Sequence, residues 1–311
     1  MAFNGTIHVN QPLSEISVSF LQELDAFVAD KACPLVQVKK ESDLYYVYDR
    51  GSFINDDGME RANGAVAREI DQGFTTSSYQ LMEHSGRMLV TDRDRDNQDV
   101  GLQLEIEATK ILTEKLMIEK ENDLGALFNT ATFTNALSAA AAQQWSLNTT
   151  SSDPLILVNT ASIIAWNASG KKPNHGVGGF RQFLFLKSHT SVLDRIKYVQ
   201  VGIPTEDLLA SLFDLKKLYF SRSVDQQRLE NKNVPVSPSA TLADVDMLLY
   251  WLPQSPGLRM PATWYTFHKG GPVIKSYRDE ERSGTWVEIS QMYQQRIVAS
   301  QTGVFMSGVI A

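Results

Sequence analysis

The side chains best suited to catalysis or metal binding are scattered along this chain. Its closest pair of histidines, His175 and His189, is fourteen residues apart, and the chain contains neither an HExxH zinc pair nor a G-x-S-x-G nucleophile elbow. The single cysteine, Cys33, precedes Pro34 and has no histidine near it in sequence, so we expect a small buried thiol rather than a nucleophile. These residue types and spacings predict neither a catalytic centre nor a bound cofactor.

One acidic segment imitates a calcium loop. Asp92-Arg93-Asp94-Arg95-Asp96 alternates three carboxylates, but Asn97 takes the place of the turn glycine and Gln103 that of the bidentate glutamate. The two interleaved arginines would also repel a cation. We therefore expect this segment to be a charged subunit contact or the entry to a helix, and we expect no metal.

Two glycine-rich segments imitate phosphate loops. Gly176-Val177-Gly178-Gly179 lacks a third glycine at the required spacing and is followed by no Walker lysine. His268-Lys269-Gly270-Gly271-Pro272 is typical of a turn that leads into a strand. Neither segment predicts a nucleotide site.

Composition narrows the class of protein further. The 311 residues are 43% hydrophobic and 21% charged, which suffices for a buried core and about two domains. The 29 basic and 36 acidic residues give a net charge of −7, which argues against a general affinity for nucleic acid. A single cysteine excludes a disulfide framework, and no apolar run reaches the ~18 residues that span a bilayer. The N-terminus has no secretory signal, so we expect a soluble protein of a reducing compartment.

The first eighty residues contain extended segments with few core residues. Residues 1–40 predict a lead-in with a short amphipathic helix around Leu21, Leu24 and Phe27, and this lead-in is either an arm on a partner subunit or an ordinary terminus. Residues 44–48 and 74–81 alternate as strands and are separated by a polar stretch, which predicts a long hairpin. Isolated hairpins are marginal in water, so an intermolecular role is indicated.

A long helix is predicted over residues 97–128, which contain no proline. At ~1.5 Å per residue it would be about 48 Å long, which is a mechanical spine rather than part of a compact active site. Gly101 and Gly125 lie near its two ends. Its apolar residues recur at helical spacing, at Leu104, Ala108, Ile111, Leu112 and Leu116.

The remaining residues predict a mixed α/β region. Its expected elements are a helix over 154–166, short buried strands over 183–186 and 198–201, a helix over 205–218, a strand over 246–252, and antiparallel strands in the last forty residues.

An arm, a long hairpin, a spine helix, an α/β region and closing strands, in this order, resemble the major capsid proteins of tailed bacteriophages, which have the Hong Kong 97 fold. Their order and spacing along most of the chain carry this resemblance. The segments that resemble the family are Phe27-Val28-Ala29-Asp30, Cys33-Pro34-Leu35-Val36, Tyr45-Tyr46-Val47-Tyr48, Arg61-Ala62-Asn63-Gly64-Ala65, Glu69-Ile70-Asp71, Tyr79, Glu83-His84, Lys172-Pro173-Asn174, His268-Lys269-Gly270-Gly271-Pro272, Tyr277-Arg278-Asp279-Glu280, Trp286-Val287-Glu288-Ile289 and Gly303-Val304-Phe305.

The resemblance implies an α+β fold with four parts. These are an N-terminal arm over 1–40, an E-loop hairpin over 41–80, a peripheral P-domain with the spine helix over 81–135 and 267–300, and an A-domain over 136–266 and 301–311. It further implies hexamers and pentamers of one chain in an icosahedral head around double-stranded DNA, assembled in the host cytoplasm and found in the virion. The DNA would be bound without sequence specificity, and no membrane would be involved.

The same resemblance implies partners and contact residues. Besides its own copies, we expect a portal, cement or decoration proteins, and a separate scaffolding protein, because the chain begins almost at the arm. Some relatives crosslink subunits through an E-loop lysine, whereas this chain has no lysine between Lys40 and Lys110, so we expect no such crosslink. The candidate inter-subunit contacts are the aromatic Tyr45, Tyr46, Tyr48, Phe53 and Phe74 and the charged Arg50, Glu60, Arg61, Arg68, Glu69, Arg93 and Arg95. The aromatic residues alternatively pack on the spine helix of their own subunit.

Three other interpretations stay open on the sequence alone. An encapsulin-like shell has the same fold and holds an enzyme cargo instead of DNA. An α/β enzyme centred on residues 155–250 would need convergent polar groups in a pocket, and the sequence offers no obvious set. A binding module with a helical stalk would leave the hairpin and the closing strands without a purpose.

Overall fold

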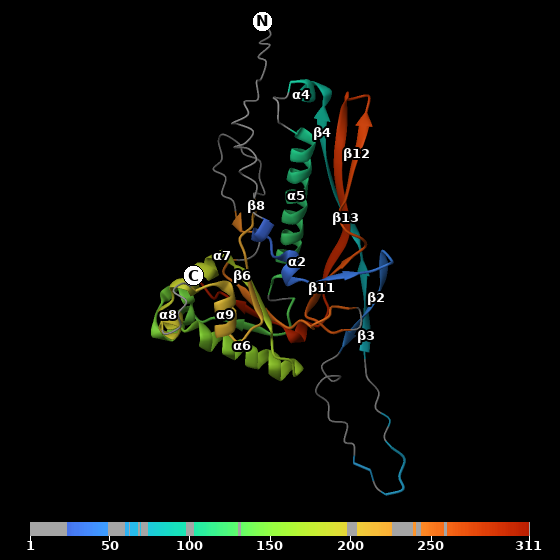
Figure 1. Ribbon diagram of the computed structural model, residues 1–311. Coiled ribbons are helices and arrows are strands. Elements are labelled where there is room, and N and C mark those ends of the chain that lie inside the picture. Colours follow the sequence, from blue (N-terminus) through green and yellow to red (C-terminus); the bar gives the residue numbers. More distant parts are fainter. Residues whose placement is uncertain are drawn as a thin grey trace.

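The protein is described here from a computed structural model (Figure 1). It describes residues 24–48, 60–61, 63–67, 69, 74–97, 103–129, 132–197, 204–225, 239–240, 244–257 and 260–310. These residues form two five-stranded sheets and two two-stranded ribbons, and helices pack against both five-stranded sheets.

The N-terminal half contains the hairpin and the long helix. Its elements are η1 (Leu24–Ala26), α2 (Ala29–Ala32), β1 (Leu35–Gln37), β2 (Ser42–Tyr48), β3 (Phe74–Gln80), β4 (Met82–Thr91), α4 (Asp92–Asp96) and α5 (Leu104–Leu127). The prediction of one helix over 97–128 is wrong at its start, because α4 ends at Asp96 and α5 begins only at Leu104. The spine is therefore 24 residues long, or about 36 Å at ~1.5 Å per residue.

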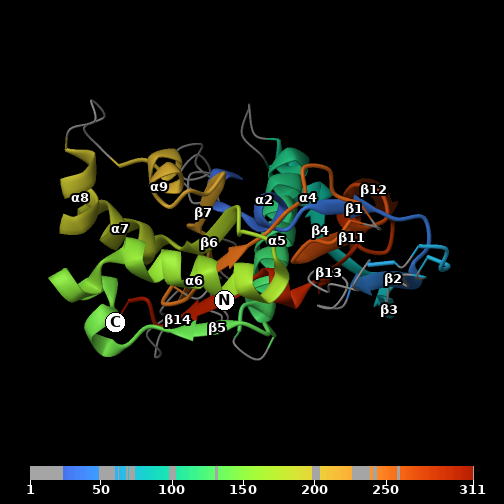
Figure 2. The ribbon, with the colours of Figure 1, turned by 90° about the horizontal axis from the view of Figure 1, so that it is seen from below.

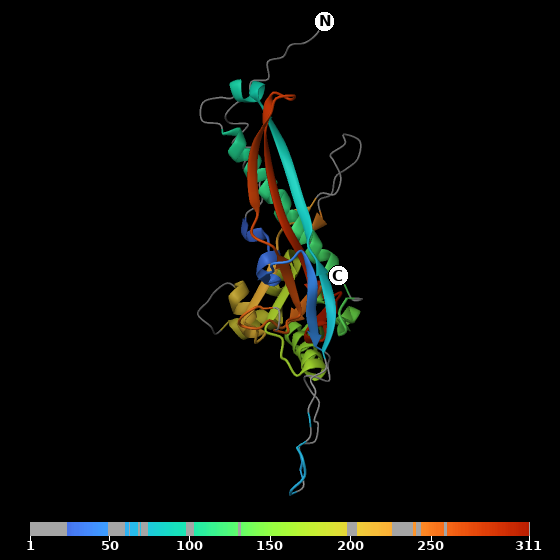
Figure 3. The same cartoon turned by 90° about the vertical axis from the view of Figure 1, so that its right-hand side faces the viewer.

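The first sheet is built around one long strand. Its order is β1-β11-β13-β12, with β11 spanning Trp264–His268, β12 Val273–Asp279 and β13 Gly284–Ile297, and β4 pairs with the other edge of β13. Figure 3 shows β4, β12 and β13 running beside α5 as one elongated unit. Val90, Leu112, Ile289 and Tyr293 form the core between this sheet and α5.

The second sheet has the order β5-β14-β10-β6-β7. Its strands are β5 (Ala136–Ser138), β14 (Val304–Ser307), β10 (Met247–Tyr250), β6 (His175–Gly179) and β7 (Lys217–Ser221). Met247 and Leu249 of β10 face one core, whereas Leu248 and Tyr250 face the other, so the sheet is buried on both sides.

Helices cover one face of the second sheet. They are α6 (Pro154–Ser169), α7 (Phe180–Ser188), α8 (Thr190–Ile196) and α9 (Glu206–Leu212). The short elements are η2 (Ala141–Gln143), η3 (Trp145–Leu147), η4 (Thr150–Ser152), β8 (Val224–Asp225), β9 (Ser239–Ala240) and η5 (Ser300–Thr302). Figure 2 shows these helices gathered at one end of the molecule and the β2–β3 hairpin at the other.

Several predicted elements are confirmed. Strands β2 and β3 pair antiparallel with Tyr45 opposite Ser77, as expected for a hairpin of residues 44–48 and 74–81. The helix from Pro154, the strand within 246–252 and the antiparallel strands near the C-terminus are also present.

Two predicted elements are wrong. Residues 183–186 lie in α7 and not in a strand, because an apolar run of four residues does not distinguish a strand from a buried helical turn. The fully buried Gln182 fixes this helix by donating to the carbonyls of Asp244 and Asp246 at 2.9 and 2.6 Å. The helix predicted over 205–218 ends at Leu212, since Asp214 adopts φ +56° and β7 then begins. The strand predicted over 198–201 and the helical residues around Leu21 lie mostly or wholly outside the described residues.

The glycines of β6 allow neighbouring residues to pack closely against the strand. A Cβ on Gly178 would lie 2.1 Å from Oε1 of Gln182, and one on Gly179 would lie 2.6 Å from Cα of Asp244. This segment is therefore a strand that a helix and a loop approach closely.

Replacing Gly179 with alanine is expected to destabilise the chain by about 1–3 kcal/mol, because backbone rather than a flexible side chain blocks the new methyl group. Urea denaturation of the unassembled chain measures the effect. Gly271→Ala is the matched control, since its Cβ would meet no atom within 4 Å. Equal unfolding midpoints for the two variants would contradict the packing argument.

Candidate assembly surface and central junction

The N-terminal segment, the spine helix and the second sheet meet at one buried carboxylate. Glu121 of α5 has no exposed surface, and its Oε2 accepts from the backbone N–H groups of Ala29 at 2.8 Å and Val28 at 3.1 Å. Its Oε1 accepts from Oγ of Ser221 in β7 at 2.6 Å. The α2 helix has no N-cap hydrogen bond of its own, so Glu121 satisfies its free N–H groups.

An ion pair reinforces this junction. Nζ of Lys120 lies 3.1 Å from Oδ2 of Asp30 and 5.4 Å from the centre of the Tyr293 ring. Burial raises the pKa of Glu121, and the neighbouring Asp30 carboxylate raises it further, while the hydrogen bonds from Ser221 and the backbone oppose the rise. Lys120 and Glu121, which are consecutive in the spine, thus both bind α2, the first α-helix among the described residues.

Sequence reasoning missed both residues. Neither is among the predicted contact residues. The spacing of the apolar residues could have indicated that Lys120 is buried. Ala108, Leu112 and Leu116 recur every four residues, and the next position in this series is Lys120.

A second polar network ties β4 and β13 to the spine. Nδ1 of His84 lies 2.8 Å from Oε1 of Glu119, and the imidazole stacks on Tyr293 with ring centres 4.2 Å apart. The Tyr293 hydroxyl donates to Asp123 at 2.8 Å, and burial raises the pKa of Asp123. Two hydrogen-bonded pairs joined by the ring stack thus connect β4 and β13 to α5.

One buried serine–histidine pair lies near the region that an α/β enzyme would use. Oγ of Ser152 is 3.1 Å from Nε2 of His189, and both residues are buried. Nδ1 of His189 accepts from the N–H of Ser191, so Nε2 carries the proton and donates to Ser152, which in turn donates to the carbonyl of Thr149. A catalytic base would accept the serine proton, so this hydrogen-bond polarity is that of a structural contact.

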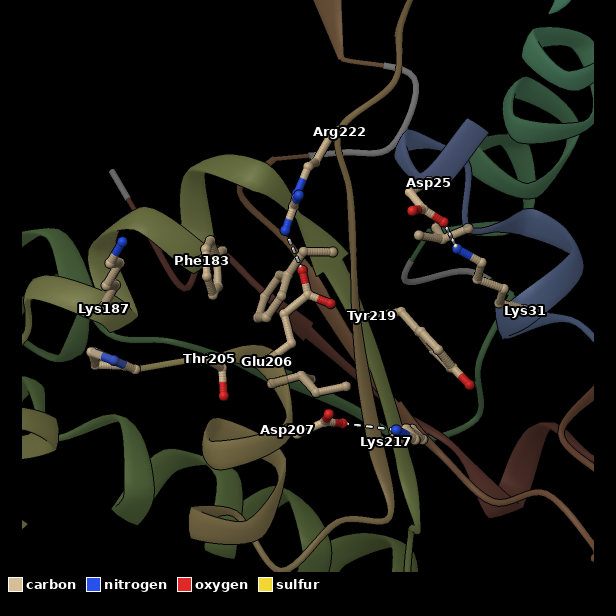
Figure 4. A pocket seen from close by; sticks show the side chains of 14 residues that line it. Asp25, Lys31, Phe183, Lys187, Thr205, Glu206, Asp207, Lys217, Tyr219 and Arg222 are labelled. Atoms are coloured by element: carbon tan, nitrogen blue, oxygen red, sulfur yellow. Dashed lines mark hydrogen bonds and ion pairs between the residues drawn. The ribbon is translucent and has the colours of Figure 1, made fainter. Parts of the chain in front are cut away.

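An open groove of about 600 Å³ lies beside β7, and Figure 4 shows the side chains that line it. Its lining includes Phe183 and Phe220, residues of α9 and residues of the 25–31 segment. Its lining contains seven charged side chains, of which all but Lys187 form three exposed ion pairs: Lys31–Asp25, Lys217–Asp207 and Arg222–Glu206. With six of the seven charges paired, the groove offers no converging acid–base set.

The calcium-like segment forms a helix entry, one of the two alternatives predicted for it. Asp92 accepts from both terminal nitrogens of Arg278, at 2.5 and 2.6 Å, and this pairing lowers the pKa of Asp92. Thr91 caps α4 and bonds to Asp94, while Arg95 pairs with Glu105. No cluster of three potential metal ligands occurs within the described part of the chain.

Among the predicted contact residues, Tyr45 is buried inside its own subunit. Its ring centre lies 5.4 Å from that of Phe267, and its hydroxyl donates to the carbonyl of Ile297 at 3.3 Å. Tyr79 stacks on the same ring at 4.8 Å. Tyr45 therefore packs on β11 of its own chain, which corrects both its assignment to a neighbour contact and the alternative that it packs on the spine.

The structure places the other contact candidates on the surface or leaves them undescribed. Tyr46 is half-buried, Arg95 is partly covered by Glu105, and Glu60, Arg61, Glu69 and Arg93 are exposed. Arg50, Phe53 and Arg68, together with the side chains of Tyr48 and Phe74, lie outside the described residues. Neighbour contacts at all of these positions stay predictions.

No helix within the described ranges combines the length and the apolar character that a bilayer crossing requires.

The sequence is related to that of a phage protein along nearly its whole length. It is 22% identical over 295 residues to the major capsid protein of Burkholderia phage BcepMu, which covers 91% of each chain. No protein-family model matches the sequence.

Solved structures share the fold. A phage-related protein from Bordetella bronchiseptica RB50 is similar with a TM-score of 0.73 and 16% identity, covering 96% of this chain and 97% of that one. The capsid of cyanophage P-SCSP1u gives 0.58 at 9% identity over 93% and 90%, and the SrpI encapsulin of Synechococcus elongatus gives 0.54 at 10% over 93% and 91%. The chain therefore has the Hong Kong 97 fold that these capsid and encapsulin structures share, and its sequence is similar to that of a phage major capsid protein.

Proposed function

We propose that copies of this chain associate into hexamers and pentamers that close an icosahedral head around double-stranded DNA. The observation that carries this proposal is the similarity to a phage major capsid protein over 91% of both chains. The net charge of −7 also suits an inner wall along which packaged DNA slides. Assembly takes place in the host cytoplasm, and the product is part of the virion.

The four expected parts of the subunit are proposed on the observed elements. The hairpin β2–β3 falls in the E-loop over 41–80, and α6 to α9 fall in the A-domain over 136–266 and 301–311. The arm over 1–40 and the P-domain over 81–135 and 267–300 complete the chain. Because β11 starts at Trp264 and pairs with β13, we move the second P-domain boundary to just before Trp264.

An encapsulin-like compartment is the second candidate, because the SrpI encapsulin shares the fold. Negative-stain electron microscopy of native particles, with nuclease-protected DNA measured on the same fractions, separates the two. Closed shells with protected DNA support the phage head, whereas shells that hold protein and no DNA support the compartment. A particle of one or two chains at every concentration would refute both.

The shell is expected to lack covalent crosslinks between subunits, because the chain has no lysine between Lys40 and Lys110. Boiled virions should run as single chains on a denaturing gel. A ladder of multiples of the chain mass, resistant to boiling, would contradict this prediction.

The proposed partners beyond the chain itself are a portal, a separate scaffolding protein and decoration proteins. Expression of this chain alone tests the need for a scaffold. Tubes or shells of irregular size would support a separate scaffolding protein, and uniform closed shells would show that none is needed.

A further inference from the structure

We propose that the outer face of α6 packs against a second copy of this chain in the assembled shell. This inference rests on the proposed function and names one of the surfaces through which that function is performed.

The amino-acid composition of α6 is unusual for a surface helix. Its 16 residues, Pro154–Ser169, include no Asp, Glu, Lys or Arg, whereas about three would be expected from the 21% charged residues of the chain. Capping residues stabilise both ends of α6. Asp153 caps its N-terminus by accepting from the N–H of Leu155 at 3.0 Å, and Gly170 ends it at φ +67°.

The two faces of α6 are both apolar. Leu157, Val158 and Ala161 point into the core over the second sheet. On the opposite side, Ile156, Ile163 and Trp166 remain 61, 56 and 58% exposed. Spacings of seven and three residues put these three side chains on one side of the helix, where they form an uncharged stripe that also contains the exposed Asn159 and Thr160.

The chemistry of the stripe selects a protein as its partner. DNA-binding and membrane-surface helices both depend on Lys and Arg, and α6 has neither. Interface centres are depleted in charge and enriched in aromatic side chains, which is the composition of this stripe. A tryptophan exposed by more than half also loses water-contacting apolar area when it is covered.

Charge further selects a second copy as that partner. Each chain carries a net charge of −7, so the long-range electrostatic force between two copies is repulsive. A contact through an uncharged helix avoids like-charge pairs between the two copies. In a ring of identical subunits such a contact is heterologous, so the stripe meets a different surface of the next copy.

The test compares three variants of the full chain under conditions in which the wild type forms shells. Ile163→Glu places a charge in the stripe, and Asn159→Lys does the same without removing any apolar side chain. Both are expected to lower the fraction of sedimenting shells at least about tenfold, while melting temperature and circular dichroism of the unassembled chain stay unchanged. Ile163→Leu is the matched control and should assemble as the wild type does.

Normal shells from both charged variants would overturn the inference while the proposed function stands. Should Ile163→Glu fail to fold, Asn159→Lys alone decides, because its position is already polar and exposed. A wild-type chain that forms only small oligomers, which Asn159→Lys dissociates, would refute the shell and keep the stripe as a contact. A wild-type chain that stays monomeric at every concentration would overturn both.

Discussion

Replacing Glu121 with alanine is expected to destabilise the unassembled chain by about 3–5 kcal/mol. The substitution leaves the N–H groups of Val28 and Ala29 and the Ser221 hydroxyl without their acceptor, in a site with no access to water. It also removes a buried side chain that nothing nearby can replace. Urea denaturation measures the free energy of unfolding.

Two further variants serve as controls for Glu121→Ala. Glu119→Ala removes a carboxylate of the same helix that is half exposed and bonds only at its tip to His84, so it should cost less than about 1 kcal/mol. Glu121→Gln keeps an acceptor oxygen and should recover most of the loss. If Glu121→Ala unfolds at the same urea concentration as Glu119→Ala, the junction does not hold the N-terminal segment.

The same carboxyl makes stability depend on pH. Burial raises the pKa of Glu121 above its ordinary value of 4.5, so the folded chain binds this proton more tightly than the unfolded chain does. The resulting contribution to stability is complete below about pH 4.5 and is lost as pH rises through the raised pKa. Because Gln does not titrate, the stability of the wild type relative to Glu121→Gln should fall as pH increases from 4 to 8. A difference that is constant over this range would show that the pKa is not raised.

Replacing Tyr45 with alanine is expected to cost the unassembled chain about 3 kcal/mol, because the ring is 95% buried against Phe267 and fills the core between the hairpin and β11. Leu44→Ala, at the preceding position, removes a side chain that is 60% exposed and should change stability by less than about 0.5 kcal/mol. Thermal denaturation of the two variants at low concentration measures the difference. A Tyr45→Ala chain that is as stable as the wild type but assembles poorly would return this residue to the neighbour contacts.

This residue also illustrates what the sequence could predict. Alternation over 44–48 identified the strand, and the matching run over 74–81 identified its partner. Alternation alone does not show which face of the strand packs on the core. Tyr45 lies on one face and its neighbours Leu44 and Tyr46 on the other, and each of these side chains could be buried. The answer depends on Phe267, more than two hundred residues away.

The buried junction around Glu121 could not be predicted from the sequence for a similar reason. Glu121 is a normal surface residue by type, and its burial depends on free N–H groups of residues 28 and 29 and on a serine of β7. These partners are 92 and 100 residues away in sequence. Local patterns therefore predicted most elements of the fold, whereas its buried polar contacts required knowledge of tertiary neighbours.

The position of β14 has a consequence for the timing of folding. This strand lies between β5 and β10, parallel to the first and antiparallel to the second, and it is the last strand among the described residues. Phe305 pairs with Ala136, 169 residues earlier, so this contact closes a very long loop, which slows folding. Without residues 304–307, β5 and β10 have no strand between them and the cores on both faces stay open. A chain that lacks these four residues is therefore expected not to fold into a unit that can assemble.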